Sequence, residues 1–430
     1  MIINGDALTV LKRMDCESVH MAVTSPPYYS PKKGLRDYKV PEMTWPDGWV
    51  GDLGKEPTPS MYARHLTEIF HELRRVLRHD STFWLNLGDS HAGSGCGPSG
   101  KTGCVQNQTE RQNHSGGSVP TPEGYKKKEL FGIPFLVGEH LRADGWYWRS
   151  IIPWFKKNGM PGSYTDRPVS TIEYILILTK TPNNYYDHVA VLQDSSESYK
   201  KDKRPSGVLR QRVNENTKYD REESQFKKQD NTGNSTYTGF NNRYKESGGS
   251  SKRFLRESDF FFNSFRGLWL DEDNEPTALM MNPKPLKMKH FAAFPPDLPG
   301  ICLLASTSER GVCPHCGSPW IRNIRKTSTT AHDGKTECDY EVGSAANRLA
   351  LLRQAARERG EEYESKYETI GWSPTCNCPN NVPVPATVLD PFNGAGSTGV
   401  ACKQHGRNYI GIDLNPDYCK MSEQRVREGK

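Results

Sequence analysis

With 430 residues, 25% of them charged and 34% hydrophobic, the chain is long enough for two or three domains, and its net charge of +6 is only weak evidence for an anionic partner. No apolar run reaches a membrane-spanning length, and the start MIINGDALTV lacks the basic-then-apolar pattern of a signal peptide, so neither a membrane protein nor a secreted one is expected. The eleven scattered cysteines indicate a reducing, cytoplasmic setting, in which clustered cysteines bind metal rather than form disulfides.

Residues 1–29 predict a strand, a short helix and a second strand. The second strand, from Val19 to Val23, is an apolar run that leads directly into TSPPYY. Two successive prolines cannot continue a hydrogen-bonded ladder, because each lacks an N–H and has a fixed φ. A core strand therefore ends in a rigid turn that carries a hydroxyl and an aromatic ring.

The middle of the chain alternates between helix and strand patterns. Apolar residues at helical spacing predict a helix over 61–79, and STFWLNLGDS predicts a strand that follows it. A second helix is expected over 130–144. Two more core strands are expected in SIIPWFKKN and TIEYILILTK.

Two long stretches are polar and poor in aliphatic residues. Residues 90–125 are rich in Gly, Ser and Asn and predict a mobile loop. Residues 191–265 contain basic runs at 199–212 and 243–256. Lys and Arg bind phosphates, and Asn, Gln and Arg read base edges, so this stretch is either a nucleic-acid recognition region or a solvated insertion, or an insertion that folds on binding.

Two cysteine pairs bracket residues 313–380. The first pair is Cys313 and Cys316 in VCPHCGSPW, and the second is Cys376 and Cys378 in PTCNCP. Four thiolates from two such knuckles suit a tetrahedral structural zinc ion, with four unmetallated thiols as the alternative. Between the knuckles, residues 344–368 predict a helix.

The C-terminal unit reads as strand, Gly-rich turn, helix, strand and helix. The first strand ends at Asp390, the turn DPFNGAG follows, and the second strand ends at Asp413. Glycines allow a ligand to approach the backbone, and an acid after the second strand can hold ribose hydroxyls. A carboxylate at Asp390 would repel a pyrophosphate, so it suits a ligand with an ammonium group, such as S-adenosylmethionine.

The C-terminal unit offers only two strands, so we expect the strands at the N-terminus to complete its sheet. The fold class expected is α/β, with helices on both faces of a Rossmann-like sheet assembled from both ends of the chain. Ligands of such sheets bind at the carboxyl ends of the strands. The turns after Val23 and Leu389 should therefore meet at one edge.

These motifs, in this order, resemble the β class of amino DNA methyltransferases, whose sheet is circularly permuted. TSPPYY is similar to the catalytic motif of that family and DPFNGAGSTG to its cofactor motif. IIPWFKKNGMPGSYTDRPVSTIEYILILTK and KHFAAFPPDL are similar to further family segments. Together these segments cover roughly half of the chain in the order of the family.

The chemistry explains the residue types of the catalytic motif. An exocyclic base amine is a poor nucleophile, because its lone pair is delocalised, and acceptors on its hydrogens favour a tetrahedral nitrogen. Ser25 Oγ and the carbonyl of Pro26 are the expected acceptors, and Pro26 and Pro27 hold that carbonyl rigidly. Tyr28 would stack on the flipped-out base for about 1–3 kcal/mol.

The resemblance also implies the cofactor site and the domain order. Asp413 would bind the ribose and Asp6 would approach the adenine of S-adenosylmethionine, while His290 and Phe291 belong to a segment that packs over it. The methionine and sugar would be surrounded by Asp390, Phe392, Gly394, Gly396 and Thr398. The expected parts are a core 1–190, a target recognition region 191–265, a segment 266–312 over the cofactor, the Cys-rich insertion 313–380 and a cofactor-binding part 381–430.

Serine in the first motif position resembles the members that methylate N4 of cytosine, whereas Asp or Asn is usual in N6-adenine enzymes. The expected function is therefore N4-cytosine methylation of duplex DNA, as the modification component of a restriction–modification system with a companion endonuclease. An N6-adenine enzyme of the same class is the main alternative. The others are an RNA or glutamine methyltransferase, a nicotinamide-dependent dehydrogenase, and a non-catalytic zinc protein that binds DNA.

Overall fold

The computed structural model describes residues 1–30, 42–93, 121–156, 167–168, 170–191, 294–328 and 365–429. Most of the predicted loop 90–125 and all but the first residue of 191–265 lie outside these ranges, as do His290 and Phe291. Within the described residues, no helix is both long and apolar enough to cross a membrane.

The two ends of the chain build one sheet, as expected. Seven strands of the described part form it in the order β1-β11-β10-β2-β5-β7-β6. The strands are β1 (Ile2–Asn4), β2 (Val19–Thr24), β5 (Leu77–Leu87), β6 (Tyr147–Phe155), β7 (Ile172–Thr179), β10 (Thr387–Asp390) and β11 (Asn408–Asp413). Ile3 lies opposite Ile412, and the terminal ammonium of Met1 donates to the carbonyl of Tyr409 at 2.8 Å.

The sheet is parallel from β1 to β5, and β7 is antiparallel to both of its neighbours, β5 and β6. The prediction of an α/β sheet assembled from both ends of the chain is therefore confirmed for the core. The parallel strands direct their carboxyl ends to one edge, where the turns after β1, β2, β10 and β11 meet.

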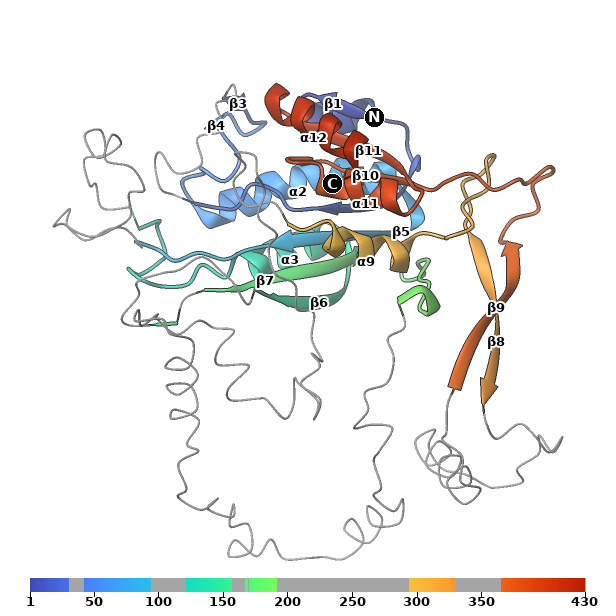
Figure 1. Cartoon of the computed structure of the whole chain (residues 1–430). Helices are drawn as coiled ribbons and strands as arrows, with labels where there is room; N and C mark the ends of the chain where they lie inside the picture. Colours follow the sequence, from blue (N-terminus) through green and yellow to red (C-terminus); the bar gives the residue numbers. More distant parts are fainter. Residues whose placement is uncertain are drawn as a thin grey trace, which may run out of the picture.

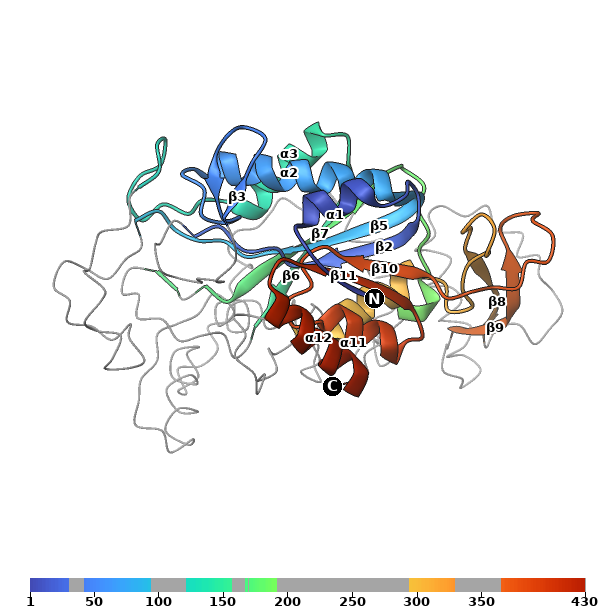
Figure 2. The ribbon, with the colours of Figure 1, turned by 90° about the horizontal axis from the view of Figure 1, so that it is seen from above.

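Helices cover both faces of the sheet (Figure 2). On one face lie α1 (Ala7–Arg13), α2 (Pro59–Val76) and α3 (Ile133–Ala143), and on the other lie α9 (Asp297–Ser306), α11 (Ser397–Gln404) and α12 (Pro416–Glu428). Two apolar cores separate these layers, one beneath α1, α2 and α3 and one around α9 and α11. The smaller elements are β3 (Met43–Thr44), β4 (Val50–Gly51) and η2 (Val189–Val191).

Helix α2 shows why the local pattern predicts most of its length. Thr58 Oγ1 accepts from the N–H of Met61 as an N-cap, and Pro59 occupies the first turn. The prediction of helix to residue 79 is wrong by three residues, because Leu77 pairs with Val19 of β2 and begins β5. Pairing with a distant strand outweighs the local helical periodicity there.

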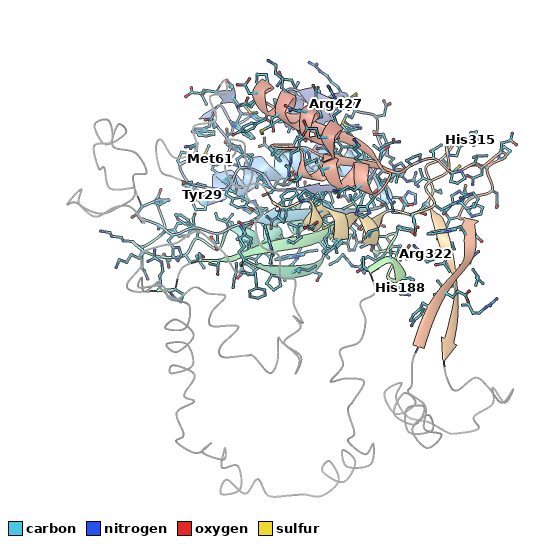
Figure 3. The ribbon with its side chains drawn as sticks, viewed as in Figure 1. Tyr29, Met61, His188, His315, Arg322 and Arg427 are labelled. Carbon is cyan, nitrogen blue, oxygen red and sulfur yellow. The ribbon has the colours of Figure 1, made fainter. Side chains whose placement is uncertain are left out.

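Strands β8 (Trp320–Ser328) and β9 (Ser365–Pro374) form an antiparallel hairpin that projects from the core (Figure 1). The predicted helix over 344–368 is wrong for residues 365–368, which belong to β9, and its remainder lies outside the described ranges. The side chain of Arg322 anchors the hairpin to the core, since its guanidinium binds Asp187 at 3.0 Å and Glu309 at 2.6 Å (Figure 3).

Candidate active site at the carboxyl edge of the sheet

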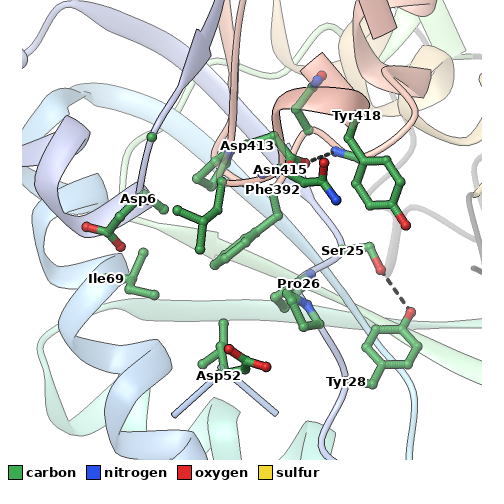
Figure 4. Close-up of a pocket in the computed structure, with 18 of the residues that line it drawn as sticks. Asp6, Ser25, Pro26, Tyr28, Asp52, Ile69, Phe392, Asp413, Asn415 and Tyr418 are labelled. Carbon is green, nitrogen blue, oxygen red and sulfur yellow. Dashed lines mark hydrogen bonds between the residues drawn. The ribbon is translucent and has the colours of Figure 1, made fainter. Parts of the chain in front are cut away.

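A pocket opens where the carboxyl ends of β1, β2, β10 and β11 meet (Figure 4). Its lining combines the turn after β2, the glycine loop after β10 and the turn after β11, so it joins segments from both ends of the chain. The lining includes four of the predicted catalytic residues and four of the predicted cofactor residues: Ser25, Pro26, Pro27, Tyr28, Asp6, Phe392, Gly394 and Asp413.

The proline turn is held from behind by α2 and by the loop before it. The hydroxyl of Tyr62 donates to the carbonyl of Pro27 at 2.8 Å, and Gly54 packs directly against Tyr28. Gly54 has a φ of +89°, and a Cβ there would lie 2.7 Å from the carbonyl oxygen of Tyr28. The turn is therefore rigid in its backbone, as two successive prolines predict.

The side chains of the turn form hydrogen bonds with one another and with the sheet. Ser25 Oγ donates to the phenol oxygen of Tyr28 at 3.0 Å, and Tyr28 donates to Glu173 Oε2 at 2.8 Å. Asn86 Nδ2 donates to the same phenol oxygen at 2.8 Å. Glu173 is the one charged residue of β7, and Asn86 follows the apolar run Phe83–Leu85 of β5. Neither carries a motif signal of its own, so neither was predicted.

The glycine loop needs its glycines at two positions. Gly396 has a φ of +76° and precedes α11, and a Cβ there would lie 2.7 Å from the Cβ of Ser422. Gly394 has a φ of +49°, and its N–H donates to Asp413 Oδ2 at 2.7 Å. This bond ties the loop to the end of β11, so the ring of Phe392 faces the pocket.

Asp413 and Asp6 line the same pocket although they lie at opposite ends of the sequence. Asp413 Oδ1 also accepts from the N–H of Asn415 at 2.9 Å, and burial raises the pKa of Asp413. Asp6 Oδ2 accepts from the N–H of Thr9 at 2.6 Å and caps α1. One oxygen of the Asp6 carboxylate is thus occupied by the N-cap hydrogen bond of α1.

Asp390 lies beneath the loop rather than in the pocket lining. Its side chain is almost fully buried and accepts from the hydroxyls of Thr24 at 2.5 Å and Thr398 at 2.7 Å. The N–H of Phe392 donates to it at 3.1 Å. Because Thr24 precedes Ser25, Asp390 joins the end of β2 to the glycine loop after β10.

A further wall of the pocket comes from residues 43–53, which lie within the Pro-, Gly- and Trp-rich stretch 30–60, a stretch whose composition predicts only a long loop. Met43, Trp45, Asp52 and Leu53 line the pocket from this segment. Trp45 stacks on the buried ring of His65 at 4.0 Å, which fixes the segment to α2. Two tryptophans within five residues were the available signal for a binding wall.

Comparison with known proteins identifies the family of this chain. The family described as DNA methylase matches residues 19–333 and 383–424, which include both motifs. The chain belongs to the β-class amino DNA methyltransferases.

Several relatives align over nearly the whole methyltransferase. The Type II methyltransferase M.Cfr9I of Citrobacter freundii is 29% identical over 427 residues, which cover 99% of this chain and 87% of that protein. M.XycI of Xanthomonas campestris pv. cyanopsidis is 27% identical over 427 residues, which again cover 99% of this chain and 87% of that protein. Among solved structures, the cytosine-N4-specific PvuII DNA methyltransferase is 11% identical, with a TM-score of 0.45, over 100% of this chain and 93% of that one.

Away from the pocket, the methyltransferase brings its two cysteine pairs together. The sulfur atoms of Cys313, Cys316, Cys376 and Cys378 all lie within 4.8 Å of one another at the base of the β8–β9 hairpin. The N–H of His315 donates to Cys313 Sγ at 3.4 Å and Asn381 Nδ2 donates to Cys376 Sγ at 3.2 Å. From the sequence, His315 and Cys338 are possible substitute ligands; His315 contributes its backbone N–H to the cluster, and Cys338 lies outside the described residues.

The burial of Asp390 predicts an unusual pH dependence of stability. Burial raises the pKa of Asp390 to about 6, above its ordinary value of 3.8. Because the Asp390 carboxyl binds its proton more tightly in the folded state than in the unfolded state, its contribution to stability is fully present below pH 3.8. That contribution is lost as the pH rises through about 6. We expect Asp390→Asn to raise the free energy of unfolding at pH 7.5 by about 1–3 kcal/mol, and the gain to shrink toward pH 5.

Denaturant unfolding of the wild type and the variant at pH 5, 6 and 7.5 measures this difference. Asp15→Asn, at an exposed position, is the matched control and should change stability equally at each pH. A variant that is less stable than the wild type by the same amount at all three pH values contradicts the expectation.

Proposed function

We propose that this methyltransferase transfers the methyl group of S-adenosylmethionine to the exocyclic N4 amine of a cytosine flipped out of duplex DNA. The observation that carries the proposal is the meeting of Ser25, Pro26 and Tyr28 with Phe392 and Asp413 in one pocket. A methyl donor held by the loop after β10 would lie beside the turn that receives the base.

The pocket fits the proposed cofactor in its chemistry. Apolar side chains for an adenine ring come from Met43, Trp45, Ile69 and Phe392. Asp413 offers a carboxylate for ribose hydroxyls, and Asp6 and Asp52 offer acceptors near the adenine end. Bound there, the cofactor supplies an electrophilic methyl on its sulfonium.

Asp390 acts on the cofactor indirectly in this proposal. Its carboxylate is occupied by Thr24, Thr398 and the N–H of Phe392, so it shapes the loop that faces the methionine part. Gly396 and Thr398 likewise support the shape of this loop and do not line the pocket themselves. His290 and Phe291 remain assigned to the segment over the cofactor, outside the described residues.

The proline turn performs the chemical step through hydrogen-bond acceptors. Ser25 Oγ and the carbonyl of Pro26 accept from the two hydrogens of the amine, which favours a tetrahedral nitrogen and an available lone pair. The pocket holds these acceptors before the base arrives, so little reorganisation is needed in the transition state. Tyr28 offers its ring to the base, which helps offset the cost of unstacking it.

The cysteine cluster is proposed to hold a structural zinc ion. Zn–S distances of about 2.3 Å place four tetrahedral sulfurs about 3.8 Å apart, which the observed cluster reaches with small movements. Four sulfur ligands leave no open position, so the ion takes no part in catalysis.

The biological setting follows from the relatives. M.Cfr9I and M.XycI are named Type II methyltransferases, and we propose the same role here, in the cytoplasm and with a companion restriction endonuclease. Target recognition is assigned to residues 191–265, which lie outside the described ranges. An N6-adenine target is the second candidate, because the proline turn would serve either amine.

Product analysis tests the proposed reaction. Incubation with S-adenosylmethionine and mixed-sequence duplex DNA, followed by digestion to nucleosides and mass spectrometry, is expected to yield N4-methylcytosine. N6-methyladenine would contradict the choice of base and keep the mechanism. Absence of both products, on genomic DNA from several sources as well, would contradict the function.

A further inference from the structure

A directed chain of hydrogen bonds runs from the catalytic turn into the sheet. Ser25 Oγ donates to the phenol oxygen of Tyr28, shown as a dashed line in Figure 4, and Tyr28 donates to Glu173 Oε2. A phenol has one hydrogen to donate and can accept two hydrogen bonds. Tyr28 accepts from Ser25 and Asn86 and donates to Glu173, so its hydroxyl is fully used.

The series of hydrogen bonds that starts at Ser25 ends in a largely buried ion pair between Glu173 and Lys156. The Glu173 side chain is 13% exposed and that of Lys156 is 18% exposed, and Lys156 Nζ binds Glu173 Oε1. Lys156 also lies over the ring of Trp154, 4.5 Å from its centre. A carboxylate this buried needs an opposite charge, and Lys156 supplies it.

Two neighbouring residues, Asn86 and Gly88, restrict the Tyr28 side chain to one orientation. Asn86, 3% exposed, donates from Nδ2 to both Tyr28 and Glu173 Oε2 at 2.8 Å. Gly88 lies against the ring edge, since a Cβ there would be 2.7 Å from a ring carbon of Tyr28. The phenol is therefore held at its oxygen and at its ring.

We propose that Glu173, paired with Lys156, is a positioning residue that sets the direction of this chain and thereby makes Ser25 Oγ an acceptor toward the substrate amine. An ionised carboxylate only accepts, so Tyr28 must donate to it. Ser25 then donates its own hydrogen to Tyr28, and its lone pairs remain for the base. The inference rests on the proposed role of Ser25 in the reaction.

Without Glu173 the direction is no longer imposed. The phenol can turn its hydrogen toward Ser25 and occupy a lone pair that the amine needs. The same geometry would then remain in the backbone of the turn, while the acceptor that faces the base is lost. The effect should therefore fall on kcat and leave cofactor binding unchanged.

The test replaces the ion pair by two apolar residues of similar length. Removing both charges together avoids leaving one buried and unpaired, so Glu173→Met with Lys156→Met should fold. We expect kcat to fall about five- to tenfold, with the KM for S-adenosylmethionine within twofold of the wild type. Glu139→Met with Arg142→Met, an exposed pair on α3, is the matched control and should retain the wild-type kcat.

A double-mutant cycle with Tyr28→Phe separates positioning from general support. If Glu173 acts only through the phenol, Tyr28→Phe alone lowers kcat about five- to tenfold, because Ser25 loses the acceptor that directs its hydrogen away from the base, and adding the methionine pair lowers kcat no further. Additive losses of kcat in the combined variant overturn the proposal. A wild-type kcat in Tyr28→Phe also overturns it, and this measurement remains available if the methionine pair fails to fold. Loss of all product in the wild type would instead contradict the proposed function.

Discussion

Ser25→Ala is expected to lower kcat for methyl transfer by about 10²–10³-fold, the loss typical of removing one preorganised polar partner of a reacting group. Ser25 lies in the pocket at the carboxyl end of β2, and its hydrogen is committed to Tyr28. The lone pairs of Ser25 Oγ are therefore left to accept from the substrate amine, and in Ser25→Ala no neighbouring side chain would replace this acceptor. Cofactor affinity should change little, because the cofactor is assigned to the loop after β10.

Steady-state kinetics with radiolabelled S-adenosylmethionine and duplex DNA measure this effect, and equilibrium binding of S-adenosylhomocysteine measures the cofactor site separately. Ser18→Ala is the control, since Ser18 is exposed and donates only to the carbonyl of Asp15. A kcat within threefold of the wild type for Ser25→Ala would remove Ser25 from the mechanism. The carbonyl of Pro26 would then be the acceptor that matters.

Cys313→Ser is expected to abolish binding of the proposed zinc ion and to release the β8–β9 hairpin from its base. Metal binding to four thiolates contributes about 10–16 kcal/mol in small zinc domains, far more than the contacts that hold this hairpin. Cys313 is nearly fully buried, and its knuckle is fastened to the core where Arg78 donates to the carbonyl of Cys316. Loss of the ion should therefore loosen the hairpin from that point outward.

Elemental analysis of the purified chain checks the first part, with about one zinc per wild-type chain and almost none in the variant. Hydrogen exchange over residues 313–328 and 365–378 checks the second, since protection should be lost there and kept in the main sheet. Cys16→Ser is the control, because Cys16 is exposed and outside the cluster. A wild-type protein that is protected in the hairpin and contains no metal would contradict the assignment.

The hydrogen bonds of Asp390 and the chain from Ser25 to Glu173 have one feature in common. Each joins the proline turn to a segment distant in sequence, Asp390 through Thr24 and Glu173 through Tyr28. The turn is thus held both beneath the glycine loop and from the antiparallel part of the sheet. This arrangement favours a site that is formed before its ligands bind.

The sequence alone determined the parts of this protein that depend on local chemistry. Two prolines after an apolar strand specify a rigid turn, and the glycines of DPFNGAG predict a tight loop before α11. The incomplete C-terminal unit required strands from the other end of the chain, because an open sheet of two strands cannot bury its faces. The spacing of the four cysteines likewise indicated that they meet.

Only the tertiary structure decided what those residues face. The sequence predicts Asp390 as a cofactor-site residue, and only the structure shows that two threonines, one of them 366 positions away, donate hydrogen bonds to its carboxylate. Residues 365–368 have a helical pattern, yet they pair with β8. Glu173 is one polar residue in an apolar strand until the fold places it against Tyr28. In each case a contact between distant segments outweighs the local preference, because burial and pairing energies depend on neighbours that the local sequence does not specify.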